Sequence, residues 1–123
     1  GMAAPELRLT TEFSADNVVI PSEKATSMAL VLNEMLQNCF DHAFTGRTQG
    51  AISVELKKTE SGCRLTVCDD GNGLPPGFNG GPQSSLGLRI IKTMAEADLH
   101  GTFKIENRPQ GGTCAEVAIP LGG

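Results

Sequence analysis

The run DDGNG at positions 69–73 places two carboxylates directly before two glycines that an asparagine separates. Leu65, Val67 and Asp69 share one parity in a predicted strand. The Asp69 carboxylate should therefore leave the strand on its apolar face, and Asp70 on the opposite face. A charge aimed inward needs a partner, and glycine lets backbone approach a ligand closely, so this run suits a donor-rich ligand such as an adenine amino group. A hairpin turn is the alternative, because Asp-Gly is a common turn pair.

Glu34, Asn38 and His42 are spaced four residues apart in a segment predicted to be helical, which puts them on one face. An oxygen-rich row of this kind can hold Mg²⁺ together with a water molecule or a phosphate. Asn38 supplies a neutral carbonyl oxygen, and Mg²⁺ usually takes few protein ligands plus phosphate oxygens. Glu34 can orient or deprotonate a nucleophile. The alternative is a solvated helix face, which is what most such rows are.

The run SSLGL at positions 84–88 lies at a predicted helix start. Free N–H groups and the helix dipole attract anions there, so a phosphate can rest on this turn, and Gly87 allows close approach. An ordinary serine N-cap would use the same residues. Residues 74–83 come just before it and contain three glycines and three prolines. They are either a mobile lid or a long connection.

The composition allows one compact domain, because 123 residues with 39% hydrophobic and 20% charged side chains are typical of a globular protein. A net charge of −4 without a Lys/Arg cluster argues against a nucleic-acid partner. No apolar run approaches the roughly 20 residues of a membrane span, so we expect no direct membrane contact by this domain. We also expect it to be cytoplasmic, whether or not the parent protein is anchored in a membrane. We interpret residues 1–2 as a tag scar and residues 3–123 as a single domain cut from a longer protein.

The four cysteines form no C-x-x-C pair, and no histidine stands at zinc spacing from them. We predict four reduced thiols in a cytosolic protein, since a disulfide would require an extracytoplasmic setting. The residues concerned are Cys39, Cys63, Cys68 and Cys114.

Hydrophobic periodicity predicts the elements that must position these residues. Residues 6–20 predict two short strands around a turn at 14–17. Residues 22–44 predict a long helix with Ser22 as its N-cap after Pro21. An angle of 100° per residue puts its apolar side chains on one arc and the row from Glu34 to His42 on the opposite arc. The apolar arc comprises Met28, Leu32, Met35, Leu36, Cys39, Phe40 and Ala43.

The rest of the chain predicts mainly strands. Alternation indicates strands at 52–57 and 63–69, an irregular stretch at 71–84, a helix at 86–99, a strand that begins at Gly101, and a last strand at 113–119. Phe103 and Ile105 should face inward, and so should Thr113, which shares its parity with the apolar positions of the last strand. The expected fold class is α+β: a two-layer sandwich with one mixed, mostly antiparallel sheet and helices on one face.

Four motifs along the chain resemble the GHKL ATPase superfamily, whose ATP-binding domains have the Bergerat fold. LNEMLQN at 32–38 resembles its N box, DDGNG at 69–73 its G1 box, SLGL at 85–88 its G2 box, and GGT at 111–113 its closing Gly-Thr. The motifs stand in the expected order and spacing and cover the chain from about Pro21 to Pro120. The N-box glutamate and the SLGLR stretch are most similar to the catalytic domains of sensor histidine kinases.

The resemblance implies a site for ATP and Mg²⁺. Asp69 would accept a hydrogen bond from the adenine amino group, with Gly73 shaping the pocket and Thr113 assisting at the adenine edge. Asn38 would hold Mg²⁺. Glu34 would be the catalytic residue, at the position of the base or water-positioning group of ATP-hydrolysing relatives. Further nucleotide contacts are implied for His42, Gly71, Leu74, Ser85, Leu86, Gly87 and Leu88, the last three through backbone that carries phosphate.

Two departures from the family pattern affect the phosphate contacts. Asp41 precedes His42 where many relatives carry a basic residue, which leaves His42 or Arg89 as the phosphate contact. Ser84 and Ser85 stand where a fuller G-x-G-x-G run would begin in the G2 box. A weaker grip on phosphate follows from both.

The resemblance implies a catalytic domain that transfers the γ-phosphoryl group of ATP to a histidine on a segment absent from this chain, with a response regulator as a further partner. Neither His42 nor His100 lies on a helix of dimerisation character, and His100 beside Gly101 is expected to cap a helix. An anti-sigma-factor-like serine kinase and binding protein is the alternative, and the G2 stretch favours the histidine kinase. A nucleotide-binding relic without chemistry is a third interpretation.

Overall fold

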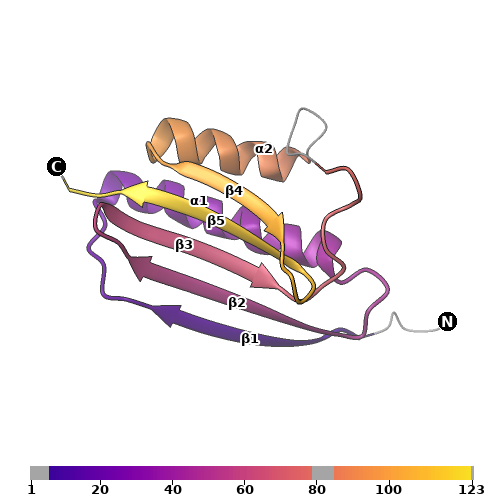
Figure 1. The fold of residues 1–123 in the computed structure, drawn as a ribbon. Coiled ribbons are helices and arrows are strands. Elements are labelled where there is room, and N and C mark those ends of the chain that lie inside the picture. The colour runs from indigo at the N-terminus through magenta and orange to yellow at the C-terminus, as the bar shows by residue number, and fades with distance from the viewer. Residues whose placement is uncertain (1–5, 79–84, 123) are drawn as a thin grey trace.

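The structure, a computed structural model, describes residues 6–78 and 85–122. Its elements follow one another as strand, helix, two strands, helix and two strands (Figure 1). The helices are α1 (Ser22–Asn38) and α2 (Leu86–Thr93), each continued by a π-helical segment, η1 (Cys39–Ala43) and η2 (Met94–Asp98). The strands are β1 (Arg8–Ala15), β2 (Gln49–Lys58), β3 (Gly62–Asp69), β4 (Thr102–Asn107) and β5 (Thr113–Pro120).

The strands form one sheet in the order β1-β2-β3-β5-β4. β1 pairs with β2 in parallel, and every other pair is antiparallel. Both helices lie on one face of this sheet (Figure 1). The predicted fold class, a mixed and mostly antiparallel sheet with helices on one face, is therefore confirmed. In the described part of the chain, no helix has the length and apolar character needed to cross a membrane.

The core lies between the sheet and the helices. Side chains of a strand alternate between the two faces, and β3 and β5 follow this rule along their whole length, with every second residue buried. The predicted inward parity of Asp69 and Thr113 is confirmed, because both are buried among these apolar neighbours. Phe103 and Ile105 of β4 are half-buried against the core, also as predicted.

The N-terminal region differs from its prediction, because residues 6–20 contain one strand instead of two. The expected turn at 14–17 does not fold back, since Ser14 and Ala15 still pair with β2. Asp16 then ends the strand: its N–H donates to the Leu56 carbonyl at 2.8 Å, and its carboxylate accepts from the Lys58 N–H at 2.7 Å. Parallel neighbours need a crossover connection, and α1 provides it.

The predicted N-cap of the first helix is wrong by one residue. Pro21 occupies the cap position and Ser22 is the first helical residue. The carbonyl of Pro21 accepts the first helical hydrogen bonds, from Lys24 at 2.9 Å and Ala25 at 3.0 Å. Among the described residues no side chain caps this end, so the N-cap preference of serine did not decide where the helix begins.

The buried stripe of α1 runs slightly to one side of the predicted arc. Val31, which the arc left out, is fully buried, whereas Phe40, which the arc included, is 49% exposed. Leu32 and Leu36 are half-buried at the border. The helix therefore meets the sheet along a narrower line than the arc indicated, and the stripe comprises Met28, Val31, Met35, Cys39 and Ala43.

The prediction of four reduced thiols is wrong, because Cys68 and Cys114 form a disulfide. The two residues are direct partners across β3 and β5, with their Cα atoms 4.1 Å apart. Their separation of 46 positions hides this proximity in the sequence. Cys39 and Cys63 are free and buried.

The second helical region agrees with its prediction over 86–99. His100 follows it with a φ of 56°, the left-handed conformation of a residue that ends a helix, and the Gly101 N–H then donates to the Ala95 carbonyl at 2.7 Å. The structural role predicted for His100 is confirmed.

Candidate functional site

The centre of the candidate site is the Asp69 carboxylate, which is only 4% exposed at the end of β3. One oxygen, Oδ1, accepts a hydrogen bond from the Gly71 N–H at 2.9 Å. The other, Oδ2, accepts a weaker one from the Cys39 thiol at 3.5 Å. A carboxylate offers about four lone-pair positions, so this one keeps acceptor capacity for a ligand that brings an N–H donor.

Thr113 stands beside this carboxylate, because Asp69 and Thr113 are direct partners in the β3–β5 pairing. Both side chains are buried on the helix side of the sheet. Gly112 comes just before and has a φ of 90°, and a Cβ atom there would overlap the Asp69 carbonyl. The closing Gly-Thr motif thus has a steric cause: only glycine lets the β4–β5 turn pass this close to β3.

The loop that follows Asp69 is fastened to the end of η1. A Cβ at Gly71 would overlap the Ala43 carbonyl, and the same carbonyl accepts from the Asn72 N–H at 2.7 Å. The Asn72 side chain donates to the Thr45 carbonyl at 2.9 Å and accepts from Arg47 Nε at 2.6 Å. The segment that follows the N box and the G1 box are therefore joined directly.

Asn107, a residue that the sequence analysis missed, holds the next turn of the loop. Its Oδ1 accepts from the Leu74 N–H at 2.8 Å. Gly73 has a φ of 81°, and a Cβ there would lie 3.0 Å from the same oxygen. Asn107 is the register partner of Thr113. In the sequence, its position directly before the turn at 108–112 could have marked Asn107 as a loop-supporting residue. The sequence does not show that its partner is Leu74, 33 positions away.

Glu34 and Gly87 come together where α1 passes the start of α2. A Cβ at Gly87 would lie 3.1 Å from Glu34 Oε2, so a larger residue would press on the carboxylate. At the same turn, Ser85 Oγ accepts from the Leu88 N–H at 3.3 Å as the N-cap of α2. The ordinary capping interpretation of Ser85 is therefore confirmed, while Ser84 lies outside the described residues.

The row from Glu34 to His42 does not stay straight. Asn38 is the last residue of α1, and His42 lies in η1. A π-helical turn holds more residues than an α-helical one, because its hydrogen bonds close from i to i+5. The four-residue spacing therefore no longer returns to the same side beyond Asn38. Glu34 and Asn38 are half-buried, whereas His42 is exposed.

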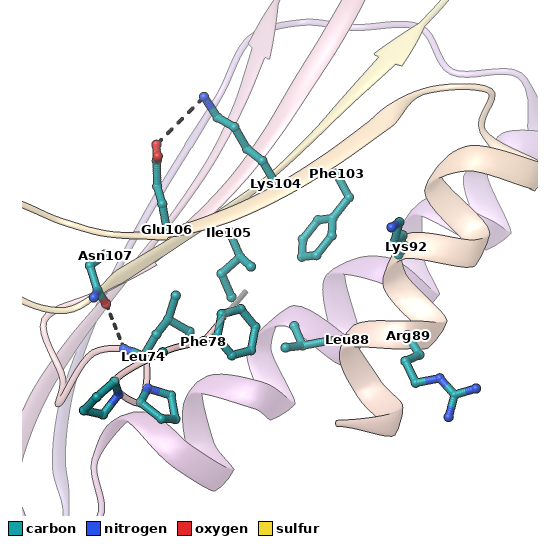
Figure 2. A pocket seen from close by; sticks show the side chains of 13 residues that line it. Leu74, Phe78, Leu88, Arg89, Lys92, Phe103, Lys104, Ile105, Glu106 and Asn107 are labelled. Atoms are coloured by element: carbon teal, nitrogen blue, oxygen red, sulfur yellow. Dashed lines mark hydrogen bonds and ion pairs between the residues drawn. The ribbon is translucent and has the colours of Figure 1, made fainter. Parts of the chain in front are cut away.

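A cavity of about 710 Å³ adjoins this centre, between β4, α2 and residues 74–78 (Figure 2). Figure 2 shows Phe78, Leu88 and Ile105 pointing toward one another, whereas the Arg89 guanidinium points away from them. Within residues 6–78 and 85–122, the lining includes neither Asp69 nor Thr113. We take the buried Asp69 carboxylate as the centre of the candidate binding site and the cavity as its neighbour, because a buried charge needs a partner, whereas the charged residues of the cavity wall can be solvated.

Leu74 and Leu88 are the predicted site residues that also line this cavity, while Leu86 is 70% exposed at the first position of α2. Arg89 lies on the rim together with Lys92, a cation that the sequence analysis did not name.

The Cys39 thiol is held protonated beside the carboxylate. Burial, followed by the charge of Asp69 and the hydrogen bond to it, raises the pKa of Cys39 from 9.0 to about 12. The thiol therefore remains a donor to Asp69 at neutral pH. This contact was also missed, although Cys39 directly follows the N-box asparagine.

Known proteins share both the sequence and the fold. Residues 23–123 match the family of histidine kinase-, DNA gyrase B-, and HSP90-like ATPases. The chain is 34% identical over 105 residues to the sensor histidine kinase PdtaS of Mycolicibacterium smegmatis, which covers 85% of this chain and 21% of that protein. It is 34% identical over 112 residues to blue-light-activated histidine kinase 2 of Erythrobacter litoralis, which covers 87% of this chain and 31% of that protein. The chain thus spans less than a third of these relatives.

The solved histidine kinase domain of the Erythrobacter litoralis EL346 blue-light-activated histidine kinase has the same fold, with a TM-score of 0.81 and 30% sequence identity. The match covers 92% of this chain and 52% of that one. The likeness therefore extends over the elements that bring Asp69, Thr113 and the N-box helix together. We conclude that the chain belongs to the histidine kinase-, DNA gyrase B-, and HSP90-like ATPase family, as an ATP-binding catalytic domain of the kind found in two-component sensor histidine kinases.

Proposed function

We propose that this domain binds ATP together with Mg²⁺ and delivers the γ-phosphoryl group to a histidine on a segment outside this chain. The observation that supports it most is the buried Asp69 carboxylate, which keeps free lone pairs and has Thr113 as its direct neighbour. Asp69 accepts the hydrogen bond of the adenine amino group, and Thr113 contacts the adenine edge. Gly71, Gly73 and Leu74 form the wall of loop backbone beside them.

Asn38 is the proposed ligand of Mg²⁺. It offers one neutral amide oxygen from a half-buried position at the end of α1. This donor fits a Mg²⁺ ion that takes few protein ligands and keeps phosphate oxygens and water for the rest. When bound, the ion supplies neutralisation of the phosphate charge.

Glu34 is the proposed catalytic residue. Its carboxylate lies next to Gly87 at the first turn of α2. The backbone from Leu86 to Leu88 would carry phosphate there, through the N–H groups of Leu86 and Gly87, because the Leu88 N–H donates to Ser85 Oγ. A carboxylate at this point orients the incoming acceptor imidazole and accepts its proton. His42 and Arg89 remain the proposed basic contacts to phosphate.

The acceptor histidine has to come from elsewhere. His100 is fixed in the left-handed conformation at the end of η2, and His42 is the phosphate contact. Transfer needs an attacking nitrogen in line with the γ-phosphorus. We therefore assign the acceptor to a dimerisation segment of the parent protein and the next transfer to a response regulator. We also assign the domain, residues 3–123, to the cytoplasm, where a disulfide such as Cys68–Cys114 is usually transient or redox-sensing rather than structural.

Labelling with γ-labelled ATP tests this proposal. The domain alone should take up no label, whereas mixing it with the upstream segment of its parent should give acid-labile label on a histidine of that segment. Glu34→Ala should slow this labelling, and Glu96→Ala, at an exposed position on η2, should not. Acid-labile label on the domain alone would contradict the separation of catalytic and acceptor parts. Label on a serine of a partner protein would favour the anti-sigma-factor-like kinase.

A further inference from the structure

The face of the sheet away from the helices carries a row of side chains that the nucleotide site does not use. Four direct register partners form it, one from each of β2, β3, β5 and β4. In this order they are Ser53, Cys68, Cys114 and Glu106. The two central members are joined by the disulfide, and both helices lie on the other side of the sheet (Figure 1).

Small molecules in solution can reach this disulfide. Both cysteines are half-buried and line a surface depression of about 430 Å³. The Arg108 side chain and the turn at 109–110 border the same depression. The border thus carries one cationic and one anionic residue, Arg108 and Glu106. Access to the sulfur atoms is a condition for thiol–disulfide exchange, and the depression provides it.

The two other cysteines are protected from this chemistry. Cys39 and Cys63 are buried, and burial raises the pKa of both thiols. The thiolate is the reactive form of cysteine. Exchange in the folded chain is therefore confined to the Cys68–Cys114 pair.

The disulfide lies one residue from the adenine site on both strands. Cys68 precedes Asp69 and Cys114 follows Thr113, and these two pairs are successive rungs of the β3–β5 pairing. Arg108 adds a second link, since its NH1 group donates to the Asp69 carbonyl at 3.2 Å. A covalent bond on one rung thus restrains the spacing of the next, which carries the carboxylate and the hydroxyl.

We propose that Cys68 and Cys114 form a reversible exchange site for low-molecular-weight thiols and disulfides, and that its oxidised form holds Asp69 and Thr113 in the arrangement that binds the nucleotide. The second half rests on the proposed function. In reduction, the thiolate of a small thiol attacks one sulfur of the bridge, the protein S–S bond breaks, and the other sulfur leaves as a thiolate and takes a proton. A second small thiolate then attacks the sulfur of the attached group, a small disulfide forms, and the protein cysteine leaves as a thiolate that takes the second proton, so two thiols supply two electrons and two protons.

Equilibration of the folded chain with mixtures of reduced and oxidised dithiothreitol tests the exchange. After trapping with iodoacetamide, mass spectrometry should find alkylation at Cys68 and Cys114 together, reversible on return to the oxidised reagent. Cys39 and Cys63 should remain unlabelled. Reduction only under conditions that unfold the chain, or labelling that begins at Cys39 or Cys63, would overturn the exchange site.

Calorimetry with ADP and Mg²⁺ tests the coupling, on the oxidised chain, the reduced chain and a C68S/C114S variant. The reduced chain and the variant should bind about threefold more weakly or worse, because they lose preorganisation. By linkage, saturating nucleotide should shift the dithiothreitol equilibrium of the wild-type pair by the same factor. Equal affinities would overturn the coupling. Binding by none of the three would overturn the nucleotide function and the coupling with it, while the alkylation measurement would still decide the exchange site.

Discussion

At the scale of single residues, the site depends on one buried charge and the groups that leave it usable. Asp69 receives one backbone N–H and one thiol, which position it without using all of its lone pairs. Strand parity, the glycines that follow and the resemblance to the G1 box identified this carboxylate from the sequence. The sequence could not show that Cys39 donates to Asp69 or that Asn107 holds the loop at Leu74, because both contacts join residues that are far apart in the chain.

Replacement of the carboxylate by an amide should abolish most nucleotide affinity. In Asp69→Asn, one acceptor oxygen becomes a donor that faces the adenine amino group, and hydrogen bonds to charged groups contribute enough for a loss of about 10- to 100-fold. Calorimetry with ADP measures this loss, and circular dichroism checks that the fold survives. Asp98→Asn, at an exposed carboxylate on η2, is the matched control. Undiminished affinity in Asp69→Asn would remove the adenine assignment.

The metal role of Asn38 predicts a selective effect. Asn38→Ala should weaken Mg²⁺-dependent binding of ATP by about tenfold, while metal-free binding of adenosine stays near the wild-type value, because only the former uses the amide oxygen. Titrations of both ligands with and without Mg²⁺ make the comparison. If both ligands lost affinity equally, Asn38 would be a structural residue only.

The Cys39 thiol predicts a loss of stability in alkaline solution. Its pKa is raised from 9.0 in an open environment to about 12 in the folded chain, so between these values the folded chain keeps a proton that the unfolded chain releases. The contribution of this thiol to the free energy of unfolding is complete below the lower pKa. It falls as the pH rises from the lower to the higher pKa, by at most about 1.4 kcal/mol per pH unit. Urea unfolding at about pH 8 and about pH 10 should show a smaller decline in Cys39→Ala than in the wild type. Equal declines would mean that this thiol does not control the effect.

At the scale of elements, local patterns predicted what repeats along the chain and missed what depends on distant partners. Alternation in β3 and β5 placed Asp69 and Thr113 correctly, because a strand face is fixed by parity. The N-terminal strand was predicted as two short strands instead of one, because β1 is almost entirely exposed and its hydrogen bonds go to β2, which follows α1 in the chain. The bend of the Glu34 row was missed as well, since an angle of 100° per residue assumes an unbroken α-helix and η1 departs from it.

The two glycines of the β4–β5 turn predict a paired experiment. Gly111 and Gly112 both have positive φ, but a Cβ at Gly111 meets nothing within 4 Å, whereas one at Gly112 overlaps the Asp69 carbonyl. Gly111→Ala should therefore lower the free energy of unfolding only by the strain of the backbone conformation, about 1 kcal/mol. Gly112→Ala should cost several-fold more in unfolding free energy, and the surviving folded fraction should bind ADP less tightly. Denaturant unfolding of the two variants side by side measures the difference, and equal costs would show that close packing against β3 is unimportant.

At the scale of the whole molecule, the described chain is one sheet with one layer of helices, and the proposed nucleotide site lies where several elements end. The ends of α1 and β3 supply Asn38 and Asp69, and the start of α2 supplies Gly87. The alignment with PdtaS of Mycolicibacterium smegmatis covers 85% of this chain but only 21% of that protein. This small share fits the proposal that the domain supplies the nucleotide chemistry and that the acceptor histidine lies on another segment.

The parallel pairing of β1 with β2 also sets an order of assembly. The β2–β3 and β4–β5 hairpins bring together near neighbours such as Lys58 with Cys63 and Asn107 with Thr113, whereas β1 must bring Arg8 to Gln49 across the whole of α1. Contacts between distant positions form late, because the chain loses the entropy of closing the loop before it gains the favourable energy of the contacts. In pulsed hydrogen exchange during refolding, the β1 amides should thus gain protection after those of β2 and β3, and simultaneous protection would contradict this order. By the same rule the β3–β5 pairing, which joins Asp69 to Thr113 over a comparable separation, should form no earlier than the β1 edge, so the proposed nucleotide site takes shape only in the last stage of folding.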